Sequence, residues 1–80
     1  MKKSFSNKEK ALLKKIGQNL QKLRHQRGIS QEQLAYDTDL DRTYISDIEQ
    51  GKKNPTIIVL SRIADTLKVQ IKDIINGNGK

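Results

Sequence analysis

The chain has 80 residues and a formal net charge of +7, which allows one small domain and favours polyanionic partners such as nucleic acids. Only 34% of the residues are hydrophobic and 4% aromatic, so the core must be built from Leu, Ile, Val and Ala, which suits helices. The absence of cysteine excludes disulfides and thiolate metal sites, and no apolar run approaches the roughly 18 residues of a membrane span, so we expect a cytoplasmic protein without a signal peptide.

The first predicted helix begins after Ser6, because Ser6 and Glu9 have the spacing of a capping box, and it ends at Gly28. Gly17 lies inside this helix and is less favourable than Ala by about 1 kcal/mol unless close packing requires it. Residues 1–6 are expected to form a flexible basic arm. The apolar residues of the helix recur at helical spacing: Leu13, Ile16, Leu20 and Leu23.

Two short helices are predicted next. Ser30 and Gln33 have the pattern of a second capping box, which opens a helix that frays near Thr38. Asp41 can accept a hydrogen bond from the N–H groups of the following turn and opens a further helix that ends at Gly51. The apolar positions fit two helices that cross at a steep angle, as in a helix-turn-helix: Leu34, Ala35, Leu40, Ile45 and Ile48.

The last part of the chain predicts two more helices after a loop that ends at Asn54 and Pro55. Thr56 caps the first, and a final turn or two covers residues 70–75 before a disordered tail, residues 77–80. The sequence therefore predicts an all-α protein of five helices, with one domain over residues 7–76. The apolar stripe of the fourth helix is Ile57, Leu60, Ile63, Ala64 and Leu67.

Charge is unevenly distributed along the chain. Residues 1–27 carry a net charge of +8, residues 28–51 of −5, and residues 52–80 of +4. The expected helix-turn-helix is therefore acidic, so attraction for phosphates must come from neighbouring segments and from helix N-termini. Many lysines in residues 1–15 are most simply explained as a solvated surface.

Four segments together resemble the Xre-type, or Cro and phage-repressor-like, family of helix-turn-helix DNA-binding proteins: residues 28–35 (GISQEQLA), 40–49, 51–56 (GKKNPT) and 60–69. The resemblance spans roughly positions 10 to 76 and implies a compact five-helix bundle of the lambda-repressor-like type. Residues 40–46 (LDRTYIS) look like the recognition helix of restriction-modification controller proteins, although other stand-alone regulators share this heptad.

Two positions depart from the family pattern. Asp39 stands where the family usually has glycine in a left-handed turn, and Asp enters that region at some cost but more readily than most residues. Gln70 replaces the usual Ser or Thr that caps the last helix. The turn should therefore survive, while the geometry of the C-terminal segment is less well determined.

The resemblance places the third helix in the major groove of DNA, with its first turn against base edges. Arg42 can donate two hydrogen bonds to guanine; the alternative is that it pairs with Asp41 or with a phosphate. Thr43 can contact thymine or serve only as a surface residue. Ser46 and Asp47, one turn further along, complete the candidate base-reading residues.

A second group of residues is expected to contact phosphates and so to add affinity without sequence information. Gln31 resembles the phosphate-binding glutamine of the family, and Tyr44 either places its hydroxyl on a phosphate or only packs. Lys52, Lys53 and Asn54 either grip the backbone from their loop or serve only solubility.

Two further sets have structural roles. Arg24 and Glu49 correspond to a family pair that forms an internal salt bridge between the first and third helices. Ile71, Ile74 and Ile75 are candidates for a dimer interface, and at least one of them is expected to pack into the core instead. His25 is expected on the surface, and Asp65 and Asp73 as solvated helix residues.

These observations predict a homodimeric, sequence-specific transcriptional regulator that binds a palindromic or pseudopalindromic operator in double-stranded DNA. Its expected partners are DNA, a second copy of the chain and RNA polymerase, in the nucleoid, with no cofactor, metal or small-molecule ligand. The alternative is an antitoxin-like protein-interaction module with secondary DNA binding. An enzyme is not expected, because the sequence contains no metal-ligand cluster, no nucleophile with an adjacent base and no glycine-rich phosphate loop.

Overall fold

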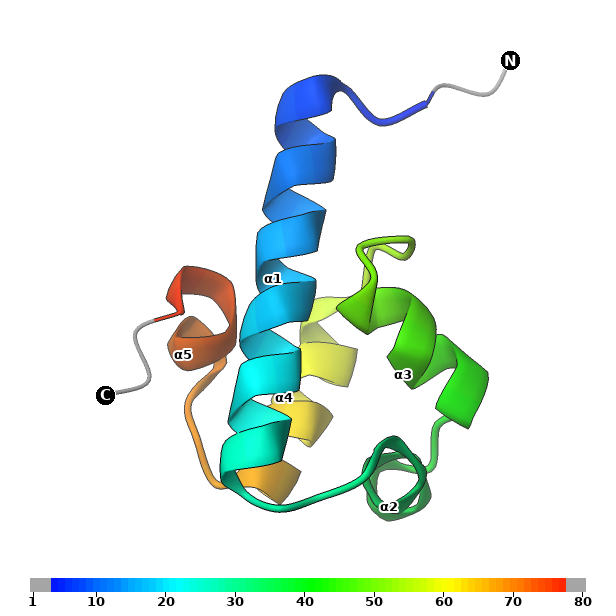
Figure 1. Cartoon of the computed structure of the whole chain (residues 1–80), viewed down its shortest axis with the longest axis vertical. Coiled ribbons are helices and arrows are strands. Elements are labelled where there is room, and N and C mark those ends of the chain that lie inside the picture. Colours follow the sequence, from blue (N-terminus) through cyan, green and yellow to red (C-terminus); the bar gives the residue numbers. More distant parts are fainter. Residues whose placement is uncertain (1–3, 78–80) are drawn as a thin grey trace.

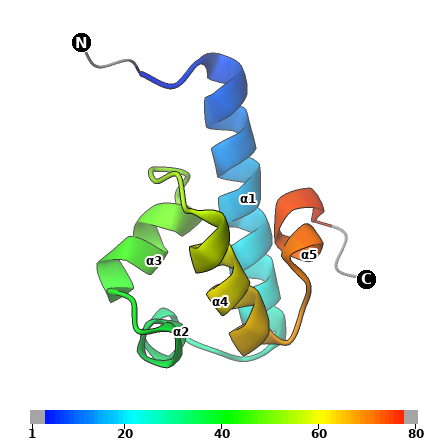
Figure 2. The same ribbon diagram turned by 180° about the vertical axis from the view of Figure 1, so that it is seen from behind.

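The computed structural model describes residues 4–77, which fold into five helices without any strand, as the sequence predicts. The long helix α1 extends along one axis, with α5 against one side and the α2–α3 pair on the other (Figures 1 and 2). Residues 1–3 of the expected arm and residues 78–80 of the expected tail lie outside the described residues. The helices are α1 (Asn7–Gln26), α2 (Gln31–Thr38), α3 (Arg42–Glu49), α4 (Ile57–Leu67) and α5 (Ile71–Asn76).

The first two helices begin with the serine caps that the sequence indicates. Ser6 and Glu9 form the complete capping box, with N–H to side-chain oxygen distances of 2.9 and 3.1 Å, so Ser6 is part of the start of α1. Ser30 accepts a hydrogen bond from the Gln33 N–H, but the Gln33 side chain donates to Asp37 instead of returning to Ser30. The predicted serine cap of α2 is confirmed, but the return bond from the Gln33 side chain is missing, so the second capping box is incomplete.

The later helix starts differ more from expectation. Asp41 precedes α3 in extended geometry, but its carboxylate makes no capping hydrogen bond, which contradicts the prediction. Thr56 caps α4 as predicted, accepting from the Val59 N–H at 3.1 Å. Asp73 accepts from the Gln70 N–H at 3.0 Å and so stabilises the start of α5. The expectation that Asp73 is only a solvated helix residue is therefore wrong. Its carboxylate accepts a hydrogen bond from the N–H of the residue that precedes α5.

The turn between α2 and α3 has the geometry of a helix-turn-helix. Asp39 adopts the left-handed conformation, with φ 60° and ψ 40°, as predicted from its replacement of the usual glycine. Its neighbour Leu40 donates from its N–H to the carbonyl of Ala35 at 2.9 Å, which closes the end of α2. Thr38, the last residue of α2, is buried and bonds the Leu34 carbonyl, so the turn packs closely against the core.

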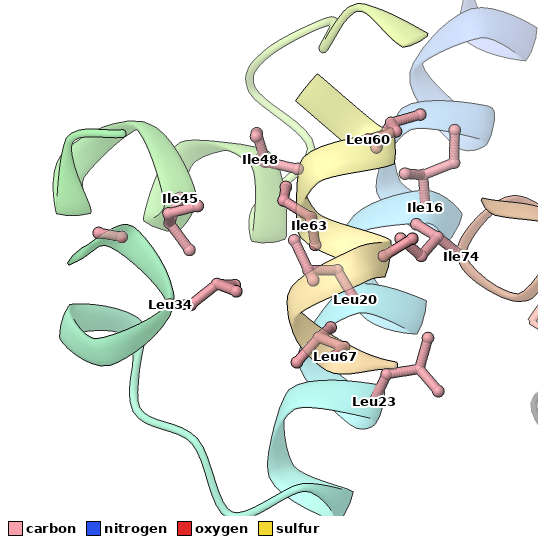
Figure 3. Packing of buried hydrophobic residues seen from close by; sticks show 12 residues of the cluster. Ile16, Leu20, Leu23, Leu34, Ile45, Ile48, Leu60, Ile63, Leu67 and Ile74 are labelled. Carbon is pink, nitrogen blue, oxygen red and sulfur yellow. The ribbon is translucent and has the colours of Figure 1, made fainter. Parts of the chain in front are cut away.

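The hydrophobic core gathers side chains from all five helices (Figure 3). Ile74 is fully buried in it, so Ile74 does not belong to the candidate dimer interface, and the expectation that at least one of the three isoleucines packs into the core is confirmed. Ile57 is predicted to belong to the buried stripe of α4 but is 61% exposed, so this stripe begins at Leu60. The core cluster comprises Ile16, Leu20, Leu23, Leu34, Ala35, Ile45, Ile48, Leu60, Ile63, Ala64, Leu67 and Ile74.

Three residues of α1 or its C-terminal end hold the other helices in place. A Cβ atom on Gly17 would collide with the backbone of α3, lying 2.5 Å from the Glu49 carbonyl oxygen, so the two helices approach closely only because residue 17 is glycine. The Asn19 side-chain amide donates to the Ile74 carbonyl at 2.7 Å. Arg27 donates through Nε to the Leu67 carbonyl at the end of α4, also at 2.7 Å. These contacts fix the positions of α3, α5 and the end of α4 relative to α1.

Candidate nucleic-acid interface

The outward side of α3 carries the residues that the sequence predicts as base-reading. Arg42 and Thr43, in the first turn, are exposed, whereas Ile45 is fully buried and anchors the opposite side of the helix. Ser46 and Asp47 are half-buried one turn further along. The helix lies at the edge of the molecule, on the side away from α5 (Figure 1), and among residues 4–77 its first two side chains are left exposed. The site is therefore a short polar surface on a buried support.

The side chain of Arg42 contacts α2. Its Nη1 donates to the side-chain oxygen of Gln31 at 3.1 Å, which joins the first residues of the two helices. The structure thus pairs Arg42 with Gln31 instead of Asp41, the intramolecular partner considered from the sequence. Among residues 4–77 this is the hydrogen bond found for the Arg42 guanidinium, so its other N–H groups can donate to an external acceptor.

Gln31 is also bound on its inner side. Its amide Nε2 donates to the Glu49 carboxylate at 3.0 Å, so the half-buried Gln31 lies between the exposed Arg42 and the interior. The amide nitrogen of Gln31 carries two N–H groups, and one of them donates to Glu49. A phosphate at the N-terminus of α2 can therefore accept only from the other N–H group. Sequence reasoning gave Gln31 a single external partner and missed both internal ones.

Arg24 and Glu49 form a two-contact ion pair between α1 and α3. Arg24 Nε lies 2.6 Å from one carboxylate oxygen and Nη2 lies 3.0 Å from the other. The two side chains are only 8% and 3% exposed, and Arg24 Nη1 also donates to the Ile29 carbonyl. Within residues 4–77 no buried side-chain nitrogen or oxygen is left without a hydrogen-bond partner. The desolvation of both charges is thus offset by complete bonding.

The other candidate contacts lie around α3. Tyr44 is half-buried and packs against the core, while its neighbour Ser46 accepts a hydrogen bond from the Gln50 side chain at 2.9 Å. Lys52, Lys53 and Asn54 are exposed in the loop that follows α3. The Lys52 N–H donates to the Asp47 carbonyl at 2.8 Å, so the loop starts from a fixed position at the end of the helix. The structure therefore places these loop residues beside the same helix that presents Arg42.

Comparison with known proteins identifies the family. Residues 20–74 match the HTH_3 family model, described as Helix-turn-helix. The chain belongs to the HTH_3 family. It is 43% identical over 62 residues to the control protein C.BamHI of Bacillus amyloliquefaciens, covering 76% of each chain. The expected resemblance to Xre-type proteins is confirmed, and the lambda-repressor-like fold with it.

Solved structures agree with this HTH_3 assignment. The restriction-modification controller protein C.AhdI of Aeromonas hydrophila is 36% identical and superposes with a TM-score of 0.78, covering 80% of this chain and 97% of the other. SinR, a master regulator of biofilm formation solved in complex with DNA, is 30% identical with a TM-score of 0.71, covering 74% and 95%. The chain is thus a helix-turn-helix transcriptional regulator of the controller and phage-repressor type.

Two of the three isoleucines predicted for a dimer interface keep some exposed surface in this HTH_3 regulator. Ile71 and Ile75 are partly buried against the core, on either side of the fully buried Ile74. Two other apolar side chains, Ile57 and Ile58, are more than 60% exposed at the start of α4. The helical periodicity wrongly placed Ile57 in the buried stripe of α4, because it cannot tell where that stripe ends, whereas Ile58 was not part of the predicted stripe.

Neither a metal site nor a membrane-spanning helix is found in the part of the chain that the structure describes. Across residues 4–77, no three His, Asp or Glu side chains come together in a way that could hold a metal ion. None of the helices in that range combines the length and the apolar character needed to cross a membrane.

Proposed function

We propose that this HTH_3 regulator binds double-stranded DNA sequence-specifically as a homodimer, on a palindromic or pseudopalindromic operator in the nucleoid of the cytoplasm. The observation that carries the proposal is the first turn of α3, where Arg42 and Thr43 are exposed while Ile45 below them is fully buried. A helix supported in this way can enter the major groove without disturbing the core.

In the proposed complex, Arg42 donates two hydrogen bonds to a guanine and Thr43 contacts the neighbouring base. Ser46 and Asp47, which face the same side one turn later, reach bases further along the groove or exclude the wrong ones.

The phosphate contacts are proposed on both sides of α3. Gln31 and the N–H groups at the start of α2 hold one strand, because a helix N-terminus favours an anion. Lys52, Lys53 and Asn54 hold the backbone from the loop after α3, and the Tyr44 hydroxyl adds a further contact. These groups set the position of the recognition helix without reading sequence.

A dimer is proposed because one α3 helix reads only a few base pairs, which is too few for selectivity in a genome. Two copies related by a twofold axis would engage half-sites about 34–36 Å apart. Ile71 and Ile75 remain the interface candidates after Ile74 is removed from the set. By analogy with the control proteins that it resembles, the regulator would act at promoters of its own or neighbouring genes, where RNA polymerase is the partner.

The test is a fluorescence anisotropy titration with duplex DNA from upstream of the chain's own gene and with a random duplex of equal length. Wild-type protein should prefer the upstream duplex by about 1,000-fold or more at physiological salt. Sedimentation of the complex should give two chains per operator. Equal affinity for the two duplexes, or specific binding by a single chain, would contradict the proposal.

A further inference from the structure

Two lysines of α1 lie next to the loop that follows α3. A Cβ atom on Gly51, at the start of that loop, would lie 3.0 Å from the Cα atom of Lys14 and 3.2 Å from its backbone nitrogen, so α1 and the loop are in close backbone contact. Lys10 precedes Lys14 by one helical turn on the same face of α1. We propose that Lys10 and Lys14 extend the phosphate-binding surface of the loop along α1 and contact DNA phosphates beyond those that the loop reaches. The inference rests on the proposed function, in which Lys52 and Lys53 hold the DNA backbone.

The face of α1 that carries these two lysines is the one that meets α3. Lys10, Lys14 and Gly17 are spaced four and three residues apart, so they follow one another along a single face of the helix. Gly17 is the position where α1 approaches the backbone of α3. The N-terminal turns of α1, which include Lys10, extend past α3 and the loop (Figures 1 and 2). Lys10 and Lys14 therefore lie on the α3 side of the molecule, in line with the loop.

Four lysines from α1 and the loop form one cationic surface, which we call the α1–loop surface: Lys10, Lys14, Lys52 and Lys53. All four are exposed, and among residues 4–77 none of them forms an ion pair. Glu9, the sole acid of residues 1–27, uses its carboxylate to accept a hydrogen bond from the Ser6 N–H. Positive charges gathered without acids repel one another, and a polyanion such as DNA offsets this repulsion.

The length of the α1–loop surface fits the backbone of duplex DNA. An α-helix rises about 1.5 Å per residue, so Lys10 lies about 10 Å from Gly17 along the axis of α1. Phosphates of one strand follow one another at about 3.4 Å of DNA axis, so this length spans about three of them. Lys10 and Lys14 can therefore each meet a phosphate of their own, which adds affinity without sequence information.

The other lysines of α1 provide a matched comparison. Lys15, Asn19 and Lys22 have the same four- and three-residue spacing, and Asn19 binds the Ile74 carbonyl of α5. Since α5 lies on the opposite side of α1 from α3 (Figures 1 and 2), Lys15 and Lys22 lie away from the proposed DNA. A helix with its side chains is about 10–12 Å thick, roughly one Debye length at 0.1 M salt, so these two charges act on the DNA only weakly. The fold thus separates lysines that composition treats alike.

The main test compares the double variant Lys10→Gln/Lys14→Gln with Lys15→Gln/Lys22→Gln. Both remove two positive charges from α1 and introduce a good helix former. Affinity for the upstream duplex is measured by fluorescence anisotropy between about 50 and 200 mM salt. We expect Lys10→Gln/Lys14→Gln to reduce the slope of log affinity against log salt concentration by about two units, one for each lost phosphate contact. Its loss of affinity relative to wild type should therefore be about tenfold larger at the lowest salt concentration than at the highest.

The matched pair Lys15→Gln/Lys22→Gln should keep nearly the wild-type slope, although it has the same net charge. Lys10→Arg/Lys14→Arg, which keeps both positive charges, should also retain the wild-type slope. Circular dichroism establishes that the variants are folded. Equal losses of slope in the two glutamine pairs would show an effect of net charge alone and would overturn the inference, as would an unchanged slope in Lys10→Gln/Lys14→Gln.

Ethylation interference locates the contacts on the operator, because an ethyl group on a contacted phosphate weakens binding. Lys10→Gln/Lys14→Gln should become insensitive to ethylation at one or both of two phosphates that adjoin those affected by Lys52→Ala and Lys53→Ala. Loss of sensitivity at the same phosphates as in the loop variants, or at none, would contradict an extension of the loop surface along α1.

Failure of this inference can be distinguished from failure of the proposed function. Phosphate contacts do not depend on sequence, so the salt slopes of all variants are also measured on the random duplex. Equal wild-type affinity for the upstream and random duplexes would contradict sequence-specific binding, while a slope reduced only in Lys10→Gln/Lys14→Gln would still support the α1–loop surface. Sequence preference in wild type together with equal slopes in both glutamine pairs would leave the proposed function standing and overturn the inference.

Discussion

The contact between α1 and α3 at Gly17 provides the sharpest test of the packing. In an ordinary helix interior, replacing glycine with alanine raises stability by about 1 kcal/mol. At position 17 the new Cβ would lie 2.5 Å from the Glu49 carbonyl oxygen and 2.7 Å from the carbonyl carbon. Both are backbone atoms, which cannot rotate away as a flexible side chain would, so the helices must separate.

The expected magnitude follows from two opposing effects. Overpacking a close contact typically destabilises a protein by about 1–3 kcal/mol, and contact with backbone belongs at the upper end of that range. After subtracting the helix-propensity gain of about 1 kcal/mol, Gly17→Ala should lower the free energy of unfolding by about 2 kcal/mol. For a domain of this size, that loss corresponds to a decrease in Tm of roughly 8–16 °C.

Thermal melting followed by circular dichroism measures the effect, with Gly28→Ala as the matched control. A Cβ atom on Gly28 would meet no other atom within 4 Å, but this residue has φ +67°, so alanine there suffers backbone strain alone, about 1 kcal/mol. Gly17→Ala should therefore be the more damaging of the two despite its regular helical backbone. A Gly17→Ala variant as stable as wild type, or more stable, would refute the close approach of α1 and α3.

Three other outcomes are expected. Lys52→Ala and Lys53→Ala should each weaken binding to all duplexes and reduce the slope of log affinity against log salt concentration by about one unit, whereas Arg42→Ala should relax specificity at one base pair. Anisotropy titrations over a salt series measure both effects, and equal behaviour of the three variants would contradict the separation of phosphate-binding from base-reading residues. Glu49→Ala should destabilise the fold by about 3–5 kcal/mol in urea unfolding because it strands the buried Arg24, and a loss below about 1 kcal/mol would show the pair to be solvated. Lys68→Gly should raise stability by about 0.5–1 kcal/mol, since Lys68 has φ 59° at the end of α4, and a lower Tm would argue against that backbone conformation.

Sequence reasoning located the helices well because their signals are local. Ser6, Ser30 and Thr56 each precede a helix and accept a hydrogen bond from the N–H three residues on, a pattern visible without knowledge of the fold. Asp39 is expected in the left-handed region because the family pattern has glycine there. The predicted cap at Asp41 was wrong. Aspartate is a preferred residue type at this position, but the Asp41 carboxylate makes no hydrogen bond to the first turn of α3.

The connections between helices could not be predicted, since they depend on which distant residues meet. Arg27 and Asn19 look like surface residues of an amphipathic helix, yet they bond carbonyl groups of Leu67 and Ile74, 40 and 55 positions away. The internal bonds of Gln31 are of the same kind. Sequence type identified this glutamine as part of the site but assigned it only an external partner.

The charge distribution separates affinity from specificity in this domain. Residues 28–51 contain α2 and α3 and carry a net charge of −5, with Arg42 as their sole cation. One of their acids, Glu49, is already neutralised by Arg24 from α1, but the exposed acids still repel phosphates. Attraction by full positive charges must therefore come from outside this segment, from lysines such as Lys52 and Lys53. Arg42 would approach DNA within an acidic surface, which repels the phosphates of any sequence. Binding is therefore most favourable where a guanine accepts hydrogen bonds from Arg42, and least favourable where only the sugar-phosphate backbone is in reach. The acidity of the motif thus favours sequence discrimination over non-specific adhesion.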